Sequence, residues 1–196
     1  GAGNDFIIVQ EKDIAFPLSK EQISFMCDRR FGIGADGLMI IKNSDKYDFE
    51  MNYYNSDGLE GTMCGNGGRC IALYANKHKI AGKEIEFMAV DGQHTAKIID
   101  GEVLLSMNNV NKIIEYEDGF FLNTGSPHFV KFVDNIDNVD VFSEGLKISN
   151  EQRFSPERTN VNFIDILNSQ TRIATFERGV ENETLACGTG TVAAAI

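Results

Sequence analysis

The same short motif, Cys-Gly-x-Gly, occurs twice in this chain of 196 residues, and its two copies are 123 positions apart. The first copy begins at Cys64 and the second at Cys187. The same offset places Phe6 on Phe129. Identities that gather at motifs and keep one spacing are what an old duplication leaves. The chain is therefore expected to fold as two similar lobes, each with one such turn.

The first half alternates between strand patterns and helix patterns. Ser19 is expected to begin a helix through a capping box with Gln22, and Cys27 and Arg30 continue the helical spacing. A second helix is expected over 68–79, with lysine and histidine in its last turn. Strands are expected over 6–9, 38–41, 49–53, 85–88, 94–99 and 103–107, and in the second half near 129–133, 161–166 and 172–176.

These patterns indicate an α+β fold whose sheets are mostly antiparallel, with a few helices. We expect residues 1–115 to form an N-terminal lobe that contains Cys64, and residues 116–196 to form a C-terminal lobe that contains Cys187. The sequence opens inside a motif-like stretch with no initiator Met and stops shortly after its last helix begins. It is therefore expected to be part of a longer protein.

Composition and charge exclude several classes of partner. The chain has 29 acidic and 18 basic residues, a formal net charge of −11, whereas a nucleic-acid partner requires a basic face. The sequence has no apolar run of membrane-spanning length and no recognisable signal peptide, so we expect a cytoplasmic protein with reduced thiols and no membrane partner. Its histidines are not at zinc-ligand spacing, so no metal is expected.

Both Cys-Gly turns are expected to run directly into a helix. The first N–H groups of a helix and its dipole favour negative charge, so a thiol at this position is easily converted to a thiolate. A single such turn is more often a tight bend with a buried cysteine. Two matched turns indicate a pair in which one thiolate removes a proton and one thiol returns it. Cys27 and Cys70 lie inside helical patterns and are expected to be packing residues.

Four further residues, at three places in the chain, carry polar chemistry next to strands. Asn4 precedes a strand and can either hydrogen-bond a substrate or hold a turn. His128 can either tune a neighbouring thiol or be an ordinary residue at a strand edge. The dipeptide Glu177-Arg178 can bind an ammonium and a carboxylate, although such dipeptides are usually surface ion pairs.

Seven motifs follow one another along the whole chain: Gly3-Asn4-Asp5-Phe6, Asn55-x-Asp57-Gly58, Cys64-Gly65-Asn66-Gly67-x-Arg69, Gly125-Ser126-Pro127-His128, Thr159-Asn160, Glu177-Arg178-Gly179 and Ala186-Cys187-Gly188-Thr189-Gly190. Together they resemble the diaminopimelate epimerase family. The resemblance implies two pseudo-symmetric lobes, each a curved, mostly antiparallel sheet wrapped around a central helix, with the active site in the cleft. The weak internal repeat agrees with this fold independently.

The resemblance also implies an activity: epimerisation of LL- to meso-diaminopimelate, in lysine and cell-wall precursor biosynthesis, without pyridoxal phosphate, metal or any other cofactor. Cys64 and Cys187 would be the acid–base pair, and His128 and Glu177 would assist the thiols. The implied partners are a small amino-acid substrate and a second copy of the chain in a homodimer. The residues implied to hold the substrate are Asn4, Asn55, Gly65, Asn66, Asn160, Glu177, Arg178, Gly188 and Thr189.

The chain departs from the family pattern at two positions. Many members have Gln where this chain has Gly37, and Asn where it has Ser126. The nearest alternative function is another racemase of the same fold, for proline or hydroxyproline, but those enzymes usually show Cys-Gly-His where Cys64-Gly65-Asn66 stands. Two alternatives from other classes are a thiol redox protein, in which the two cysteines form a switchable disulfide, and a binding module that does not need them.

Overall fold

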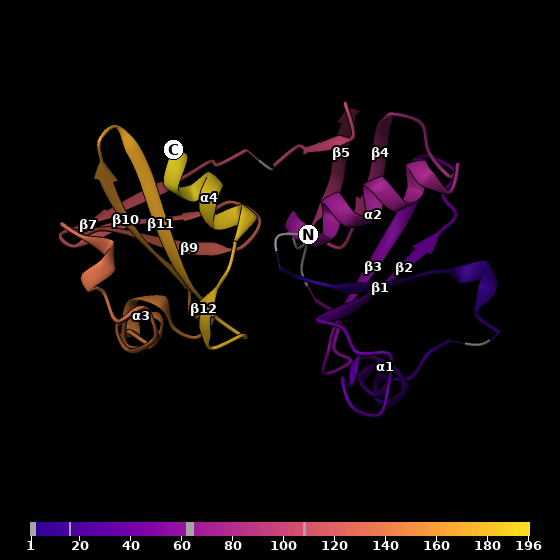
Figure 1. The fold of residues 1–196 in the computed structure, drawn as a ribbon, viewed down its shortest axis with the longest axis horizontal. Helices are drawn as coiled ribbons and strands as arrows, with labels where there is room; N and C mark the ends of the chain where they lie inside the picture. The colour runs from indigo at the N-terminus through magenta and orange to yellow at the C-terminus, as the bar shows by residue number, and fades with distance from the viewer. Residues whose placement is uncertain (1–2, 16, 62–64, 108) are drawn as a thin grey trace. The chain divides into compact units, whose positions relative to one another are not determined.

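The computed structural model of this chain describes residues 3–15, 17–61, 65–107 and 109–196. The chain divides into two compact units, Gly1–Ser106 and Met107–Ile196, and each unit contains one six-stranded sheet (Figure 1). In the described part of the chain, no helix has the length and apolar character needed to cross a membrane.

The sheet of the first unit keeps its strands in chain order. Strands β1 and β2 pair in parallel, as do β3 and β4, and the other neighbours are antiparallel. The strands are β1 (Phe6–Gln10), β2 (Gly37–Lys42), β3 (Phe49–Asn55), β4 (Glu84–Ala89), β5 (Gly92–Ile99) and β6 (Glu102–Leu105). A short 3-10 helix, Glu11–Asp13, follows β1.

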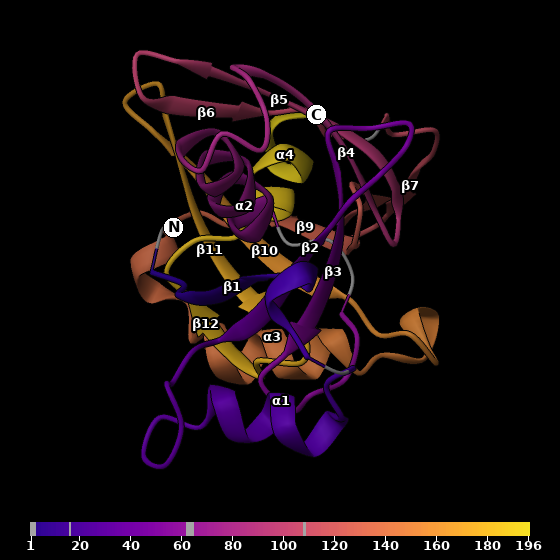
Figure 2. The ribbon, with the colours of Figure 1, turned by 90° about the vertical axis from the view of Figure 1, so that its right-hand side faces the viewer.

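Two helices cover the opposite faces of this sheet (Figure 2). Successive side chains of a strand point to opposite faces, and β2 is apolar on both. Leu38 and Ile40 pack with α1 (Lys20–Cys27), while Met39 and Ile41 pack in the cluster that contains α2 (Gly65–Lys77). Burial of each such side chain stabilises the fold by about 1.5–3 kcal/mol. This double coverage explains why β2 is an unbroken apolar run in the sequence.

The observed helix ends differ from the sequence prediction in two places. The capping box at Ser19 is confirmed, but α1 ends at Cys27, so the prediction that Arg30 continues the helix was wrong. The Asp28 carboxylate accepts hydrogen bonds from the backbone N–H groups of Arg30 and the following residue, at 2.8 and 2.7 Å, and this closes a turn. Helix α2 begins at Gly65, three residues before the predicted start, and ends at Lys77.

The sheet of the second unit has the order β12-β11-β10-β9-β8-β7, and among its described strands only β9 and β10 pair in parallel. Its strands are β7 (Ile113–Tyr116), β8 (Gly119–Asn123), β9 (Pro127–Phe132), β10 (Asn160–Leu167), β11 (Gln170–Glu177) and β12 (Asn182–Thr184). Its helices are α3 (Val141–Ser149) and α4 (Gly188–Ala195), with short 3-10 turns at Ile136–Asn138 and Gln152–Phe154.

Strand β10 again faces two helices. Val161 and Phe163 lie in the core cluster that contains residues of α3, whereas Ile164 lies in the cluster that contains Ala193 of α4. By strand alternation, Asn160 and Asn162 lie on the same face as Ile164, toward α4. On this face, β10 is therefore polar in its first residues and apolar further along the strand.

The internal repeat predicted from the sequence is confirmed at the level of whole elements. An offset of 123 residues carries β1, α1, β2, β3 and α2 of the first unit onto β9, α3, β10, β11 and the start of α4. In both units the first two of these strands are parallel and the second and third are antiparallel. Among the strands of the described residues, seven of the ten pairings are antiparallel, as predicted.

Candidate active site

Cys187 is the N-cap residue of α4, at the helix start that the sequence predicts. Its backbone is extended, and its carbonyl accepts hydrogen bonds from both the N–H and the hydroxyl of Thr191, each at 2.9 Å. The Cys187 side chain is half-buried. A sulfur placed here meets the positive end of the helix dipole, which favours its thiolate.

The last glycine of the second Cys-Gly-x-Gly turn is required by close packing. A Cβ atom on Gly190 would lie 2.4 Å from Oδ1 of Asn162 and 3.3 Å from Sγ of Cys187. The motif therefore brings the first turn of α4 down onto β10, directly against a buried amide.

The buried side chain of His128 connects to Cys187 through the hydroxyl of Thr189. Nε2 of His128 lies 2.8 Å from Oγ1 of Thr189, and that oxygen lies 3.4 Å from Sγ of Cys187. Burial, with a smaller effect from the positive charge of Arg178, lowers the pKa of His128 to about 4. The imidazole is therefore neutral near pH 7 and acts on the thiol as a hydrogen-bonding group, without a positive charge of its own.

Asn160 links three segments around this histidine. Its amide nitrogen donates to Oγ of Ser126 and to the carbonyl of Pro127, both at 3.1 Å, and its Oδ1 accepts from the backbone N–H of Arg178 at 3.0 Å. Ser126, one of the two departures from the family pattern, also lies 3.0 Å from Nε2 of His128. The serine is thus part of the polar network beside the helix start.

Glu177 is the last residue of β11, and Arg178 follows it next to this network. Glu177 alternates with buried Phe176, so it lies on the same face of the sheet as Thr175. The guanidinium of Arg178 donates to the carbonyl of Glu157. The structure thus places Cys187, His128, Thr189, Asn160 and Arg178 in or beside one network, and it places Glu177 on the same face.

In the first unit, Cys64 lies outside the described residues, and the structure describes its neighbours Gly65 and Asn66 as the buried start of α2. Nδ2 of Asn66 donates to Oδ1 of Asn4 at 2.7 Å, and the Asn66 oxygen accepts from Arg69. Two of the predicted substrate-binding residues, 62 positions apart, therefore touch each other. Both amides have their donor and acceptor ends fixed by neighbours.

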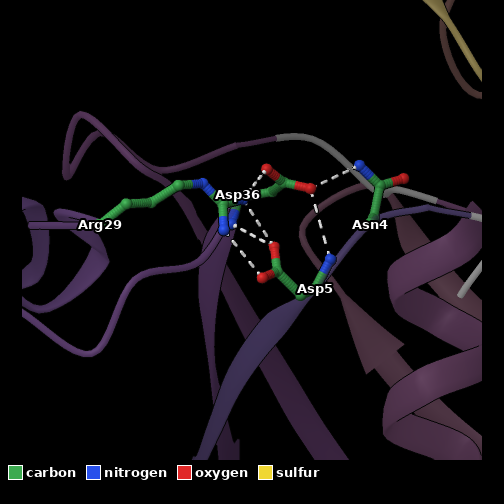
Figure 3. A network of polar contacts seen from close by, with 4 residues as sticks. All are labelled: Asn4, Asp5, Arg29 and Asp36. Atoms are coloured by element: carbon green, nitrogen blue, oxygen red, sulfur yellow. Dashed lines mark hydrogen bonds and ion pairs between the residues drawn. The ribbon is translucent and has the colours of Figure 1, made fainter.

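A carboxylate network that the sequence motifs did not predict holds Asn4 in place (Figure 3). Oδ2 of Asp36 accepts from Nδ2 of Asn4 at 2.9 Å. Arg29 donates to both oxygens of Asp5, at 2.9 and 2.8 Å, and to Oδ1 of Asp36 at 2.7 Å. The arginine also lowers the pKa of the Asp5 carboxyl, mainly through these hydrogen bonds.

The other departure from the family pattern, Gly37, has a steric reason. A Cβ atom on Gly37 would lie 2.6 Å from Cε2 of Tyr53 and 2.6 Å from the carbonyl oxygen of Tyr54. The ring of Tyr53 therefore fills the space that a side chain at this position would need. Asn55 pairs with Gly37 across β2 and β3 and is exposed at the strand end, where its Oδ1 would be 3.1 Å from a Cβ atom on Gly61.

Comparison with known proteins identifies the chain's relatives. A family model described as diaminopimelate epimerase matches residues 1–116 and 120–196. The chain belongs to the diaminopimelate epimerase family. A diaminopimelate epimerase of Flavobacterium psychrophilum is 47% identical over all of this chain and 78% of its own length. One from Chlorobaculum tepidum is 45% identical over all of this chain and 80% of its own length.

A structural likeness confirms the predicted fold class. The crystal structure of a hydroxyproline epimerase from Agrobacterium vitis superposes with a TM-score of 0.68, covering 99% of this chain and 73% of that one, at 14% sequence identity. At this identity the likeness shows the fold alone. The choice between diaminopimelate epimerase and a proline-type racemase therefore depends on the much higher identity to the diaminopimelate epimerase family.

In each unit, the polar network beside the helix start includes residues that lie outside the seven sequence motifs. They are Asn162 and Thr175 in the second unit, and Asp36 and Arg29 in the first. One signal was visible for Asn162, because two asparagines at alternate positions interrupt the apolar strand Asn160-Val161-Asn162-Phe163-Ile164 on one face only. Among the described residues, no group of three or more His, Cys, Asp and Glu side chains is arranged to hold a metal ion. That the activity needs no cofactor stays a prediction.

Proposed function

We propose that this chain interconverts LL- and meso-diaminopimelate by a two-cysteine acid–base mechanism without a cofactor. By its family the chain is an isomerase, and the observation that carries the proposal is the match to diaminopimelate epimerases over the whole chain at up to 47% identity. The arrangement around Cys187 supports the same chemistry.

The reaction requires removal of an α-proton from an amino acid, which is a very weak acid. Inversion at that carbon requires a base on one side and an acid on the other. Two cysteines fit these roles, because a thiolate removes the proton from one face while a thiol supplies a proton to the other. In the reverse reaction the two roles exchange. The chemistry therefore needs both Cys64 and Cys187 at one α-carbon.

The setting of Cys187 suits a group that alternates between thiol and thiolate. The helix start favours the charged form, and the Thr189 hydroxyl at 3.4 Å offers a hydrogen bond to sulfur. Neutral His128 stabilises that hydroxyl without adding a positive charge that would trap the thiolate permanently. We assign the matching role in the first unit to Cys64 from the sequence.

The polar groups near the two helix starts supply substrate recognition in this proposal. Asn4, Asn66 and Asn55 present amides suited to the carboxylate and ammonium groups of the substrate. Arg178 presents a guanidinium for a carboxylate, and Glu177 presents a carboxylate for an ammonium. Gly65, Gly188, Thr189 and Asn160 complete the proposed set.

The proposed cellular role is a step of lysine and cell-wall precursor biosynthesis in the cytoplasm, carried out by a homodimer. The name of the family supports the pathway. The net charge of −11 agrees with a small-molecule substrate and no nucleic-acid partner.

The test is a substrate comparison with the purified full-length enzyme. LL-diaminopimelate, L-proline and trans-4-hydroxy-L-proline are incubated separately and the stereoisomers are separated by chiral chromatography. We expect turnover of LL-diaminopimelate alone, its loss in Cys187→Ser and Cys64→Ser, and its retention in Cys70→Ala. Turnover of the proline substrates, or full activity in Cys187→Ser, would contradict the proposal.

A further inference from the structure

Two buried residues fix the orientation of His128: Asn162 contacts the histidine, and Thr175 contacts Asn162. Nδ2 of Asn162 lies 3.0 Å from Nδ1 of His128 and 3.2 Å from the carbonyl oxygen of Phe129. The hydroxyl of Thr175 donates to Oδ1 of Asn162 at 3.0 Å. His128 and Asn162 have no exposed surface, and Thr175 is 4% exposed.

These contacts determine which way the Asn162 amide faces. The carbonyl of Phe129 can only accept a hydrogen bond, so the atom of Asn162 beside it must be the amide nitrogen. The same nitrogen faces Nδ1 of His128, and an amide nitrogen can only donate. Nδ1 must therefore be the unprotonated nitrogen of the ring, and the neutral imidazole carries its proton on Nε2.

The protonated Nε2 in turn orients the next hydroxyl. Nε2–H donates to Oγ1 of Thr189 at 2.8 Å, which leaves the threonine proton available for Sγ of Cys187 at 3.4 Å. In the opposite tautomer, Nε2 would accept the Thr189 proton and the sulfur would lose that donor. The orientation of the Asn162 amide thus decides which group donates and which accepts in the hydrogen bonds from His128 through Thr189 to Cys187.

We propose that Asn162, oriented by Thr175 and the Phe129 carbonyl, is a positioning residue that holds His128 in its Nε2–H form, so that Thr189 donates to the thiolate of Cys187. This inference rests on the proposed function for its catalytic meaning, but the tautomer and the thiol reactivity can be measured without substrate. The side chains of Ser126 and Asn160, which also approach Nε2 of His128, are neutral. The positive charge of Arg178 acts on His128, and Glu177 lies on the same sheet face as Thr175.

The first measurement is the tautomer itself. Long-range ¹⁵N–¹H correlation spectra of the labelled enzyme resolve its three histidines, which are assigned with His78→Gln and His94→Gln variants. We expect His128 in the wild-type protein to show an unprotonated Nδ1 and a protonated Nε2 near pH 7. In Asn162→Ala, where no amide faces Nδ1, we expect a mixture of the two tautomers.

The second measurement is the rate at which iodoacetamide alkylates Cys187, followed by peptide mass spectrometry across pH. Loss of a hydrogen bond to a charged sulfur raises the thiol pKa, so we expect the rate near neutral pH to fall roughly threefold to tenfold in Asn162→Ala. Thr175→Val should give a smaller fall, because the Phe129 carbonyl still orients the amide.

Ser149→Ala is the matched control. It removes another buried hydrogen bond of the same unit, from Ser149 Oγ to the carbonyl of Thr159 at 2.6 Å, without touching His128. Its alkylation profile should equal that of the wild type. If Asn162→Ala does not fold, Thr175→Val carries the test.

The inference is overturned by a wild-type His128 protonated on Nδ1, by folded variants that alkylate at the wild-type rate, or by an equal fall in Ser149→Ala. If tautomer and alkylation respond as expected while LL-diaminopimelate is not turned over, the proposed function fails and the positioning role stands. If folded Asn162→Ala turns over LL-diaminopimelate normally with an unchanged alkylation profile, the positioning role fails and the proposed function stands.

Discussion

Burial of His128 should make the stability of the fold depend on pH in a window where few other groups titrate. The side chain has no exposed surface, and desolvation lowers the pKa of His128 to about 4 in the folded protein. An exposed histidine in the unfolded chain has a pKa of about 6.5. As the pH falls through this interval, the unfolded chain binds a proton that the folded chain excludes. Stability is therefore fully present above about pH 6.5 and is lost as the pH falls toward about 4.

The size of the effect follows from these two values. Between about pH 7.5 and about pH 5, the unfolded chain takes up most of one proton at this site and the folded chain almost none. Proton linkage converts that difference into a loss of roughly 2 kcal/mol of stability. The carboxyl groups of Asp5, Asp118 and Asp165 have lowered pKa values because they accept hydrogen bonds from arginines, and their contribution is lost only at lower pH.

The assay compares the wild type with His128→Gln by urea unfolding, followed by far-UV circular dichroism, at several pH values. Glutamine does not titrate, and its amide nitrogen can still donate toward Thr189. We expect the wild type to lose roughly 2 kcal/mol more than the variant between about pH 7.5 and about pH 5. Equal losses in the two proteins would refute the conclusion that His128 is buried in its neutral form.

Three packing predictions can be checked by urea unfolding or by the activity assay. Phe163→Ala should cost about 3–5 kcal/mol, because its fully buried ring fills the core under α3, and a cost below about 1 kcal/mol would contradict that packing. Gly190→Ala should slow epimerisation more than it destabilises the fold, since its Cβ would displace Asn162, 2.4 Å away; wild-type turnover would show that the contact does not matter. Gly37→Gln should be destabilising, because the ring of Tyr53 fills the space that the glutamine side chain would need. Adding Tyr53→Ala should recover only part of the lost stability, because the carbonyl oxygen of Tyr54 remains in the way. A Gly37→Gln variant as stable as the wild type would contradict this steric explanation.

The internal repeat could be predicted from the sequence because its motifs keep one spacing. The starts of α1 and α4 could be predicted because they depend on short-range chemistry. The capping box at Ser19 and the Cys187 turn each lie within a few residues of the elements they begin. Strand β2 was predictable because its apolar run covers both faces of a sheet.

Helix α3 was not predicted, although an offset of 123 residues from α1 points to its position. Gly145 lies in its middle, and glycine disfavours a helix interior by roughly 1 kcal/mol relative to alanine. In the fold this glycine allows close packing, since a Cβ there would lie 2.3 Å from Cβ of Phe176. Tertiary contact thus overrides local propensity. Strand β12 was also missed, because three residues are too few to show alternation.

The supporting residues of the site were missed for a different reason. Asn162 contacts a histidine 34 positions away, and Asp36 contacts an asparagine 32 positions away. Such partners are brought together by the pairing of strands that are distant in sequence, β9 with β10 and β1 with β2, and a local pattern does not show which strands pair. The two cysteines were visible because the Cys-Gly-x-Gly turn repeats in both halves of the chain, whereas the substrate-binding residues were predicted from the resemblance to the family.

Epimerisation of LL-diaminopimelate in D₂O tests most directly whether two cysteines act on one α-carbon from opposite sides. A thiol exchanges its hydrogen with solvent, so the acid delivers deuterium to the product while the base removes protium from the substrate. With two cysteines in these roles, deuterium appears at the α-carbon of newly formed meso-diaminopimelate while the remaining LL-isomer initially stays unlabelled. Deuterium entering the LL-isomer as fast as the product, or a product that keeps the protium of the substrate, would contradict the two-cysteine mechanism.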